Sequence, residues 1–406
     1  MSKRCVGIVK EGKVPPDFRV PLTPHQCVEV MEKFPHITVK VESSPIRKFK
    51  DEEYEKLGIQ VVQDLSDCDI LMGVKEVPIP MLLEGKTYLF FSHTLKKQPH
   101  NAKLMRALLD KKIRLIDYEA IKNEQGKRLI GFGRYAGIVG TYQGWRTFGL
   151  KQNLYSILSP SQCDDRKAME EEMKKIVIPQ NTKVVVTGFG RVGNGAEEIM
   201  GLLPIKRVSA DEFLTQSFSE PVYVHLDTHE YYERIEGGGF DKKEFYANPE
   251  KYHSVLPKYV AGADMYVACH LWAGTNPVLI TKEDVAAENW KCMVLADVSC
   301  DTNGPIAPTI KASKIADPIF GYHRHDHIEV DYKNEQAIAV MSIDNLPCEL
   351  PKDASEDFGN ELIKNVFPDL FTDLMSPSIW NATETTEEGK LTPHFEYLKE
   401  YAESAH

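Results

Sequence analysis

Ionisable side chains follow four short apolar runs in the first third of the chain. The runs cover residues 6–9, 70–74, 87–92 and 114–118, and the residues that follow them are Arg19, Lys75 with Glu76, His93, and Glu119. A lysine, a histidine and carboxylates can transfer protons, and an arginine can bind a carboxylate through two hydrogen bonds. Each residue alone is more often a solvated loop charge. Their joint placement at the ends of successive runs predicts one acid–base and anion-binding site.

A second pattern predicts a binding site for a dinucleotide. Residues 183–196 read Lys-Val-Val-Val-Thr-Gly-Phe-Gly-Arg-Val-Gly-Asn-Gly-Ala, which places Gly188, Gly190 and Gly193 in the spacing Gly-x-Gly-x-x-Gly after an apolar run. The first glycine allows a tight turn, the second lets the backbone approach a pyrophosphate, and the third lets a helix pack on its strand. The amides at the start of that helix then favour the diphosphate. The alternative is a structural turn that binds nothing.

The residue that ends the next strand should distinguish NAD from NADP. A carboxylate there binds the ribose 2′-hydroxyl and repels a 2′-phosphate. One candidate strand ends at Ser209, close to the basic residues Lys206 and Arg207, and a second candidate strand ends at Asp227. The pattern favours NAD and leaves NADP open.

Strand-like and helix-like patterns alternate along the chain, and they must bring these side chains to common edges. The helical pattern at 24–33, which begins after the N-cap residue Thr23, separates the first apolar run from the next at 38–42. A second strand–helix series runs from Lys183 to about Tyr322. This alternation predicts an α/β fold of two doubly wound Rossmann-like domains with an interdomain cleft. Parallel sheets of this kind bind ligands at the carboxyl ends of their strands, which is where the ionisable residues lie.

We expect residues 1–133 and about 335–406 to form a substrate and catalytic domain, and residues 134–334 to form the dinucleotide-binding domain. The return to the first domain rests on an apolar run at 338–346, which we interpret as a strand that packs back on it. The glycines at helical spacing in 134–150 predict a close-packed connecting helix.

Composition excludes several classes of protein. The 406 residues carry 49 Lys and Arg against 60 Asp and Glu, for a net charge of −11, which argues against a nucleic-acid or anionic-membrane surface. The apolar runs are far shorter than the roughly 20 residues that a membrane-spanning helix needs. The N-terminus has no signal-peptide pattern, so we expect a cytoplasmic protein with small-molecule partners. The sequence leaves a homo-oligomer open.

Cysteine and histidine patterns give little support for a metal site. Eight cysteines occur without a Cys-x-x-Cys pair, which signals neither a zinc site nor a disulfide framework. His323, His325 and His327 alternate, so in a strand they could face one side and bind a metal. We interpret them as part of a polar loop and predict no metal.

The motifs around the ionisable residues resemble the alanine dehydrogenase and saccharopine dehydrogenase superfamily. The stretches that carry this resemblance are Val9-Lys-Glu, Phe18-Arg-Val-Pro-Leu-Thr-Pro24 and Gly73-Val-Lys-Glu-Val-Pro78. Residues 90–98, 115–119, 296–302 and 341–355 are similar to the lysine-forming saccharopine dehydrogenases, and especially to the lysine–ketoglutarate reductase domain of the animal bifunctional lysine-degrading enzyme. The resemblance covers nearly the whole chain.

The resemblance implies a reversible, NAD(P)-dependent oxidation of saccharopine to lysine and 2-oxoglutarate. Lys75 matches the general base and His93 the second acid–base group, while Glu76 and Glu119 match the acids that tune them. The positions that match substrate-binding residues are Arg19, Gln98, Arg128 and Phe132. The cofactor-binding residues are expected to be Gly188, Gly190, Arg191, Val192, Gly193, Ser209 and Asp297, of which Gly190, Arg191 and Asp297 match family contacts.

Two departures keep the choice of cofactor open. Val192 replaces a cysteine of the fungal enzymes, and the stretch 213–251 is longer than theirs. The reductase domains have a similar insertion, and they use NADP. NAD remains the cofactor that the sequence favours.

The base role sets a condition on Lys75, and two other functions remain as alternatives. The pKa of Lys75 must be lowered by burial or by a neighbouring cation, and Glu76 opposes that shift. One alternative is an alanine dehydrogenase-type amino acid dehydrogenase, which the stretches Phe-Ser-His at 91–93 and Ile-Asp-Asn-Leu-Pro at 343–347 argue against. The other is a noncatalytic dinucleotide-binding regulatory protein, which the presence of both Lys75 and His93 argues against.

Overall fold

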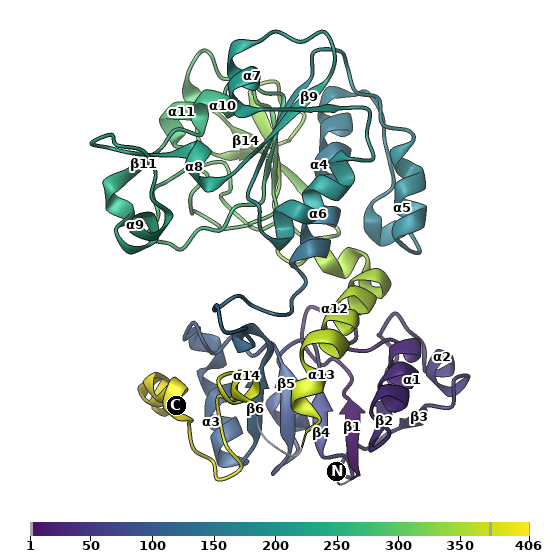
Figure 1. The fold of residues 1–406 in the computed structure, drawn as a ribbon. Coiled ribbons are helices and arrows are strands. Elements are labelled where there is room, and N and C mark those ends of the chain that lie inside the picture. Colours follow the sequence, from purple (N-terminus) through teal and green to yellow (C-terminus); the bar gives the residue numbers. More distant parts are fainter. Residues whose placement is uncertain (1–2, 373–375, 406) are drawn as a thin grey trace. The chain divides into compact units, whose positions relative to one another are not determined.

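A computed structural model describes residues 3–372 and 376–405, and the chain divides into two compact α/β units (Figure 1). Unit 1 comprises Met1–Phe132 and Pro351–His406, and unit 2 comprises Gly133–Leu350. Each unit contains a largely parallel sheet with helices and its own buried core. The predicted α/β class is confirmed.

Unit 1 is built on a six-stranded parallel sheet with the order β3-β2-β1-β4-β5-β6. Its strands are β1 (Arg4–Ile8), β2 (Ile37–Glu42), β3 (Gln60–Val62), β4 (Ile70–Met72), β5 (Thr87–Phe90) and β6 (Arg114–Asp117). Adjacent side chains in β4 enter different cores, because Ile70 and Met72 face one side of the sheet and Leu71 the other. The order of strands places the carboxyl ends of β1, β4, β5 and β6 side by side.

Helices from both ends of the chain cover this sheet. They are α1 (Pro24–Lys33), α2 (Asp51–Glu55), α3 (Ala102–Asp110), α12 (Pro351–Asn365), α13 (Phe367–Leu370), α14 (Pro377–Trp380) and α15 (Lys399–Glu403). Thr23 caps α1, as predicted, because its Oγ1 accepts the Gln26 backbone N–H at 3.3 Å. The Gln26 side chain then donates to Asn360 Oδ1 of α12 at 2.9 Å. The C-terminal helices are thus part of unit 1.

Unit 2 contains an eight-stranded sheet with the order β15-β14-β16-β13-β12-β7-β9-β8. Its strands are β7 (Lys183–Thr187), β8 (Lys206–Val208), β9 (Val222–Leu226), β12 (Met265–Ala268), β13 (Val294–Asp297), β14 (Ile319–His323), β15 (Glu329–Val330) and β16 (Ala337–Met341). Only the pairings of β14 are antiparallel. A separate hairpin joins β10 (Tyr232–Arg234) and β11 (Tyr252–Ser254). Although β8 follows β7 in the chain, the neighbours of β7 in the sheet are β12 and β9, and β8 pairs with β9.

The helices of unit 2 are α4 (Gly133–Gln152), α5 (Arg166–Met173), α6 (Arg191–Met200), α7 (Ala210–Thr215), α8 (Thr228–Tyr231), α9 (Lys242–Ala247), α10 (Pro257–Val260) and α11 (Lys282–Ala286). The predicted glycine-rich helix is α4, and it packs closely on α6. A Cβ at Gly137 would lie 1.9 Å from the Val192 carbonyl oxygen, so only glycine allows this approach.

Both units also contain short 3₁₀ helices. These cover Ile79–Met81, Pro99–Asn101, Tyr118–Ala120, Pro160–Gln162, Pro249–Lys251, Leu346–Glu349 and Pro393–Leu398.

The structure corrects one expected boundary. We predicted that the apolar run at 338–346 would return to the first domain near residue 335, but β16 pairs with β13 and β14 inside unit 2. Unit 1 resumes at Pro351, the first residue of α12. A continuous apolar run is typical of a strand that is buried on both faces. This pattern predicts the strand itself but does not indicate which of the two sheets the strand joins.

Candidate active site

The carboxyl edge of the unit 1 sheet brings Glu76 and His93 together. Glu76 follows β4 and His93 follows the neighbouring strand β5, which places His93 Nδ1 2.6 Å from Glu76 Oε1. Lys13, from the loop after β1, has its Nζ 2.8 Å from Glu76 Oε2. The side-chain amide of Asn101 lies 3.4 Å from Glu76 Oε1. Three loops therefore meet at one carboxylate.

These contacts determine the charge of Glu76 and the orientation of His93. Burial raises the pKa of Glu76, but the hydrogen bonds from His93 and Lys13 outweigh it and lower the pKa to about 2. Glu76 is therefore a carboxylate at neutral pH. Because it binds His93 Nδ1, the ring nitrogen that can exchange a proton with a ligand is Nε2.

Lys75 meets the condition that a base role requires. Burial is the largest cause that lowers its pKa, and the nearby cations Arg19 and Lys13 lower it further. Asp17 and Glu76 act in the opposite direction. The net shift is downward, toward the range in which a lysine can accept a proton.

Glu11 is a buried group that the sequence analysis did not single out. Its carboxyl oxygens accept the backbone N–H groups of Val74 at 2.6 Å and Lys75 at 3.0 Å. Burial, and then the charge of Asp17, raises the pKa of Glu11 to about 8. Glu11 fixes the backbone from which Lys75 projects, and the only sequence signal for it was the motif at residues 9–11.

Arg19 is buried and already holds a carboxylate. Its Nε and Nη2 lie 3.0 Å and 2.6 Å from the two oxygens of Asp17, and its side chain is 2% exposed. The guanidinium carbon stands 4.2 Å from the centre of the Phe132 ring, which stacks on Phe358 at 4.4 Å. The Nε and Nη2 side of the Arg19 guanidinium thus binds Asp17, and Phe132 is partly buried against the core of unit 1. Substrate binding by Arg19 and Phe132 stays a prediction.

Glu119 and Arg128 form the more exposed part of the site. Arg128 Nη2 lies 2.5 Å from Glu119 Oε1, and Lys96 Nζ lies 3.6 Å from the same oxygen. Burial raises the pKa of Glu119, but Arg128 and Lys96 outweigh it and lower the pKa. Both Glu119 and Arg128 line a cavity of about 580 Å³, and the Arg128 side chain is 42% exposed. Gln98 lies in the loop after β5, where its backbone carbonyl accepts a hydrogen bond from the Tyr401 hydroxyl at 2.5 Å.

The glycine loop of unit 2 has the geometry that its spacing predicts. Gly188 has a φ of +92°, and a Cβ there would lie 2.4 Å from the Cys269 carbonyl oxygen. A Cβ at Gly193 would lie 1.7 Å from the Gly188 carbonyl oxygen. A Cβ at Gly190 would meet nothing within 4 Å, which leaves open space in front of the start of α6. Backbone can therefore approach a phosphate at Gly190.

The cavity at this loop carries an unpaired buried nitrogen. It measures about 440 Å³, and its walls include Gly190, Arg191, Val192, Asp227 and His270. His270 is 5% exposed, and among residues 3–372 and 376–405 its Nε2 has no hydrogen-bond partner. Burial lowers the pKa of His270 to about 4, so the ring is neutral. A buried polar atom without a partner is rare, and a bound ligand would satisfy it. The residues present fit a dinucleotide.

The order of strands distinguishes the two candidates for ribose recognition. Asp227 directly follows β9, the neighbour of β7, whereas Ser209 directly follows the edge strand β8. Ser209 caps α7, since its Oγ accepts the Glu212 backbone N–H at 3.3 Å. Both residues line a cavity of about 550 Å³ beside Phe189. Asp227 therefore occupies the position at which a Rossmann fold reads the ribose.

Two further residues hold the loops of this site. Asp297 is fully buried and accepts hydrogen bonds from Ser299 Oγ at 2.5 Å, the Cys300 backbone at 3.0 Å and Thr309 Oγ1 at 2.6 Å. Its side chain thus organises the loop after β13, and the cofactor contact of Asp297 stays a prediction. His225, which the sequence analysis missed, places Nε2 2.6 Å from the Gly188 carbonyl oxygen.

The histidine cluster forms local contacts. His323 Nδ1 lies 3.0 Å from Asp326 Oδ2, and His327 Nδ1 lies 3.0 Å from the Tyr322 hydroxyl. Within the described ranges, no group of three His, Cys, Asp or Glu residues is arranged to hold a metal ion. In the same ranges, no helix has both the length and the apolar character to cross a membrane.

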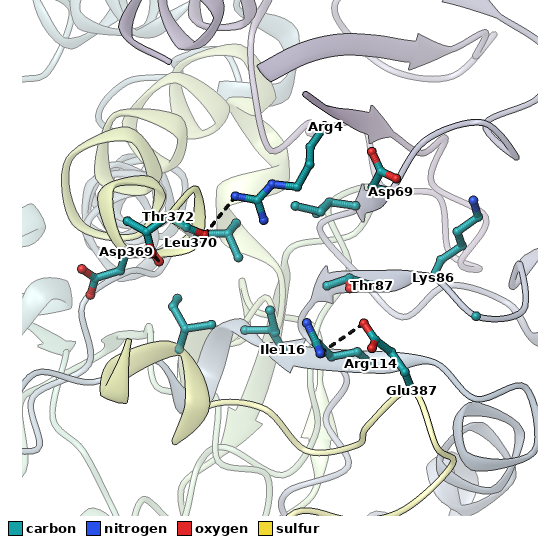
Figure 2. Close-up of a pocket in the computed structure, with 13 residues that line it drawn as sticks. Arg4, Asp69, Lys86, Thr87, Arg114, Ile116, Asp369, Leu370, Thr372 and Glu387 are labelled. Atoms are coloured by element: carbon teal, nitrogen blue, oxygen red, sulfur yellow. Dashed lines mark hydrogen bonds and ion pairs between the residues drawn. The ribbon is translucent and has the colours of Figure 1, made fainter. Parts of the chain in front are cut away.

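A second cavity of unit 1 lies at the opposite edge of the sheet (Figure 2). It measures about 470 Å³, and its walls include Arg4, Thr87 and Arg114, the first residues of β1, β5 and β6. Arg4 Nη2 donates to the Thr372 carbonyl at 3.2 Å, and Arg114 Nη2 lies 3.1 Å from Glu387 Oε1. The acid–base groups follow the other ends of the strands, so this cavity is separate from the candidate active site.

Comparisons with known proteins confirm the resemblance. Residues 7–139 match the family "Alanine dehydrogenase/PNT, N-terminal domain". The chain is 28% identical over 403 residues to alpha-aminoadipic semialdehyde synthase of Arabidopsis thaliana, a match that covers 89% of this chain and 38% of that protein. For the mitochondrial enzyme of Rattus norvegicus the identity is 29%, covering 90% of this chain and 44% of that protein. The chain thus spans less than half the length of these relatives.

Relatives that this chain matches over most of their length, and solved structures, agree with this placement. Lysine-forming NAD(+) saccharopine dehydrogenase of Candida albicans is 26% identical, over 90% of this chain and 92% of that protein. A solved L-alanine dehydrogenase has a TM-score of 0.65 at 19% identity, covering 98% of this chain and 99% of its own. Transhydrogenase from Sinorhizobium meliloti has a TM-score of 0.62 at 15% identity, covering 96% and 100%. The fold is that of the alanine dehydrogenases and transhydrogenases, and the saccharopine dehydrogenases among the relatives imply a dinucleotide cofactor, NAD(P).

Proposed function

We propose that the chain catalyses the reversible, NAD(P)-dependent oxidation of saccharopine to lysine and 2-oxoglutarate. The observation that carries the proposal is Lys75, whose pKa is lowered, next in sequence to the Glu76–His93 pair at the carboxyl edge of the unit 1 sheet. The same chain carries a glycine loop that fits a dinucleotide. The lysine-forming relatives support this substrate over others.

Each residue near Lys75 has a distinct part in the proposed reaction. Lys75 accepts the proton of the secondary amine, because only the neutral amine can lose a hydride from the neighbouring carbon. His93 activates water through Nε2 and then protonates the departing lysine amine, while Glu76 holds the other ring nitrogen. Arg128 binds a substrate carboxylate, and Arg19 lowers the pKa of Lys75 from its buried position.

The residues of unit 2 favour NAD over NADP. The Gly190 backbone and the start of α6 would hold the pyrophosphate, and Asp227 would hold the ribose hydroxyls. When bound, the dinucleotide supplies the hydride acceptor. The carboxylate of Asp227 supports NAD because it would repel a 2′-phosphate.

The decisive test is turnover by the purified protein. We expect oxidation of NADH with lysine plus 2-oxoglutarate, and little or none with ammonia plus pyruvate. Parallel reactions with NADPH measure the cofactor preference. Turnover only with pyruvate and ammonia would favour an alanine dehydrogenase. NADH binding without turnover of either pair would favour a regulatory protein.

A further inference from the structure

Two buried carboxyl groups lie directly behind His93, and the proposed reaction does not use them. Asp117 ends β6, and Glu384 lies 267 residues later, in the C-terminal segment. Both side chains are fully buried. Glu384 reaches this position because its segment runs along β6, where the Glu384 backbone N–H donates to the Leu115 carbonyl at 2.8 Å. The chain therefore brings a distant acid to the loop that carries the candidate acid–base histidine.

Both carboxyl groups bind the residues on either side of His93. Asp117 Oδ2 accepts the Ser92 backbone N–H at 2.9 Å and also the Ser92 hydroxyl. Glu384 Oε2 accepts the Thr94 hydroxyl at 2.7 Å, and Glu384 Oε1 lies 3.3 Å from Ser92 Oγ. Ser92 and Thr94 are themselves fully buried. Between them, His93 has a φ of +53°, a conformation that non-glycine residues adopt only where surrounding contacts hold it.

The balance of hydrogen-bond donors and acceptors in this cluster indicates which carboxyl group is neutral. Four oxygen–oxygen contacts join Ser92, Thr94, Asp117 and Glu384. Each of the two hydroxyl groups can donate one hydrogen bond, so the hydroxyl protons account for only two of the four contacts. A third hydrogen bond requires that one carboxyl group carries a proton. Asp117 already accepts three donors, the third being the Glu119 backbone N–H at 2.6 Å from Oδ1. The additional proton therefore belongs on Glu384. Burial raises the pKa of both carboxyl groups, but the hydrogen bonds from Ser92 and Glu119 oppose the rise at Asp117, whereas the charge of Asp117 adds to the rise at Glu384.

We propose that Glu384 is a neutral carboxylic acid that acts with ionised Asp117 to hold the Ser92–Thr94 loop, and so positions His93 against Glu76. This inference rests on the proposed function in so far as His93 is an acid–base group. Glu384 is a positioning residue, because it acts on His93 only through the loop. Its neutral state matters because two buried carboxylates this close would repel each other and open the loop.

The test compares Glu384→Gln with Glu384→Ala and Asp117→Asn. A glutamine can donate to Ser92 and accept from Thr94, as the neutral acid does, so Glu384→Gln should keep turnover within a few-fold. Glu384→Ala should lower kcat on the order of tenfold to a hundredfold, because it releases the loop. Asp117→Asn should also lose activity, since its amide would face groups that donate. The exposed Glu388→Gln, in the same segment, is the matched control.

A second readout keeps the inference separate from the proposed function. The NMR signal of the isotope-labelled His93 ring should move in Glu384→Ala and stay in place in Glu384→Gln, whether or not the protein turns over saccharopine. If Glu384→Ala does not fold, Thr94→Val removes one hydroxyl and should move the signal in the same direction. Equal losses in Glu384→Gln and Glu384→Ala would overturn the neutral state. An unmoved His93 signal and unchanged kcat in Glu384→Ala would overturn the positioning role.

Discussion

At the scale of single residues, Lys75 carries the most specific chemical prediction. Lys75→Met should slow the hydride step by roughly 10²- to 10⁴-fold, the usual contribution of an acid–base group, because it keeps the side-chain volume and removes the base. NADH affinity should not change, since the glycine loop belongs to unit 2. Stopped-flow measurement of NADH formation from saccharopine gives the rate.

The same substitution at Lys103→Met, on the exposed face of α3, is the control and should be silent. Methylamine added to Lys75→Met should restore part of the turnover. A Lys75→Met protein with near-wild-type turnover in the absence of any amine would show that another residue is the base.

Arg19 and Arg128 lie in different surroundings in the structure, although the sequence predicts the same substrate-binding role for both. Arg128→Ala should weaken binding of saccharopine by roughly 1.5–3 kcal/mol, because a charged hydrogen bond to a carboxylate is lost, and should leave the unfolding temperature close to that of the wild type. Arg19→Ala should instead destabilise unit 1 by about 3–5 kcal/mol, because Asp17 is left buried without its partner. Michaelis constants and thermal unfolding measured on both variants distinguish these roles. Arg106→Ala, which removes an exposed arginine of α3, is the control.

The pKa of Glu76 predicts how stability depends on pH. Its pKa is lowered from 4.5 to about 2 in the folded protein, so its contribution is complete above pH 4.5 and is lost as the pH falls toward 2. The shift corresponds to about 3 kcal/mol at neutral pH. Glu76→Gln should therefore lose stability at pH 7 and less at pH 3. Urea unfolding at several pH values measures the difference, and Glu55→Gln, which changes an exposed acid, should follow the wild type.

Sequence reasoning identified the residues at strand ends and missed those that come from loops. Lys75 and His93 directly follow recognisable strands, so their placement at one edge could be predicted. Lys13 and Asp17 lie in a loop without periodicity, and nothing in the sequence indicates that Glu384 is near His93. Arg19 matches a substrate-binding position by residue type, and nothing in the sequence indicates that Asp17, two residues away, binds its guanidinium.

At the scale of elements, the order of β9 and β8 predicts the cofactor. Asp227→Asn keeps the hydrogen bond to the Thr228 backbone, which Asp227 Oδ1 accepts at 2.7 Å, and removes only the charge. We expect the preference for NADH over NADPH to fall by about tenfold or more, the equivalent of 1.4 kcal/mol, because the repulsion of the 2′-phosphate is lost. Fluorescence titration with both nucleotides gives the ratio.

Ser209→Ala is the matched comparison, because Ser209 directly follows β8, the strand that comes next after β7 in the chain. It should leave the ratio unchanged. If Ser209→Ala moves the preference and Asp227→Asn does not, the assignment of the ribose position to β9 is wrong. The sequence predicts both strands as candidates for the ribose position, and the strand that lies next to β7 can be identified only from the structure. The order of strands in a sheet depends on long-range contacts that local sequence patterns do not encode. The placement of β16 in unit 2 has the same origin.

At the scale of the whole molecule, the two separate cores predict that the dinucleotide stabilises one unit. Without substrate, NADH at 100 times its dissociation constant should stabilise unit 2 by about 2.7 kcal/mol, since it binds the folded glycine loop and not the unfolded chain. Hydrogen exchange followed by mass spectrometry should show added protection in peptides of 183–297 and none in peptides of 4–117. The Gly190→Val variant should lose this protection while it folds normally, because its side chain enters open space that the pyrophosphate needs. Protection of unit 1 by NADH alone, or retained protection in Gly190→Val, would contradict the assignment of the two roles to separate units.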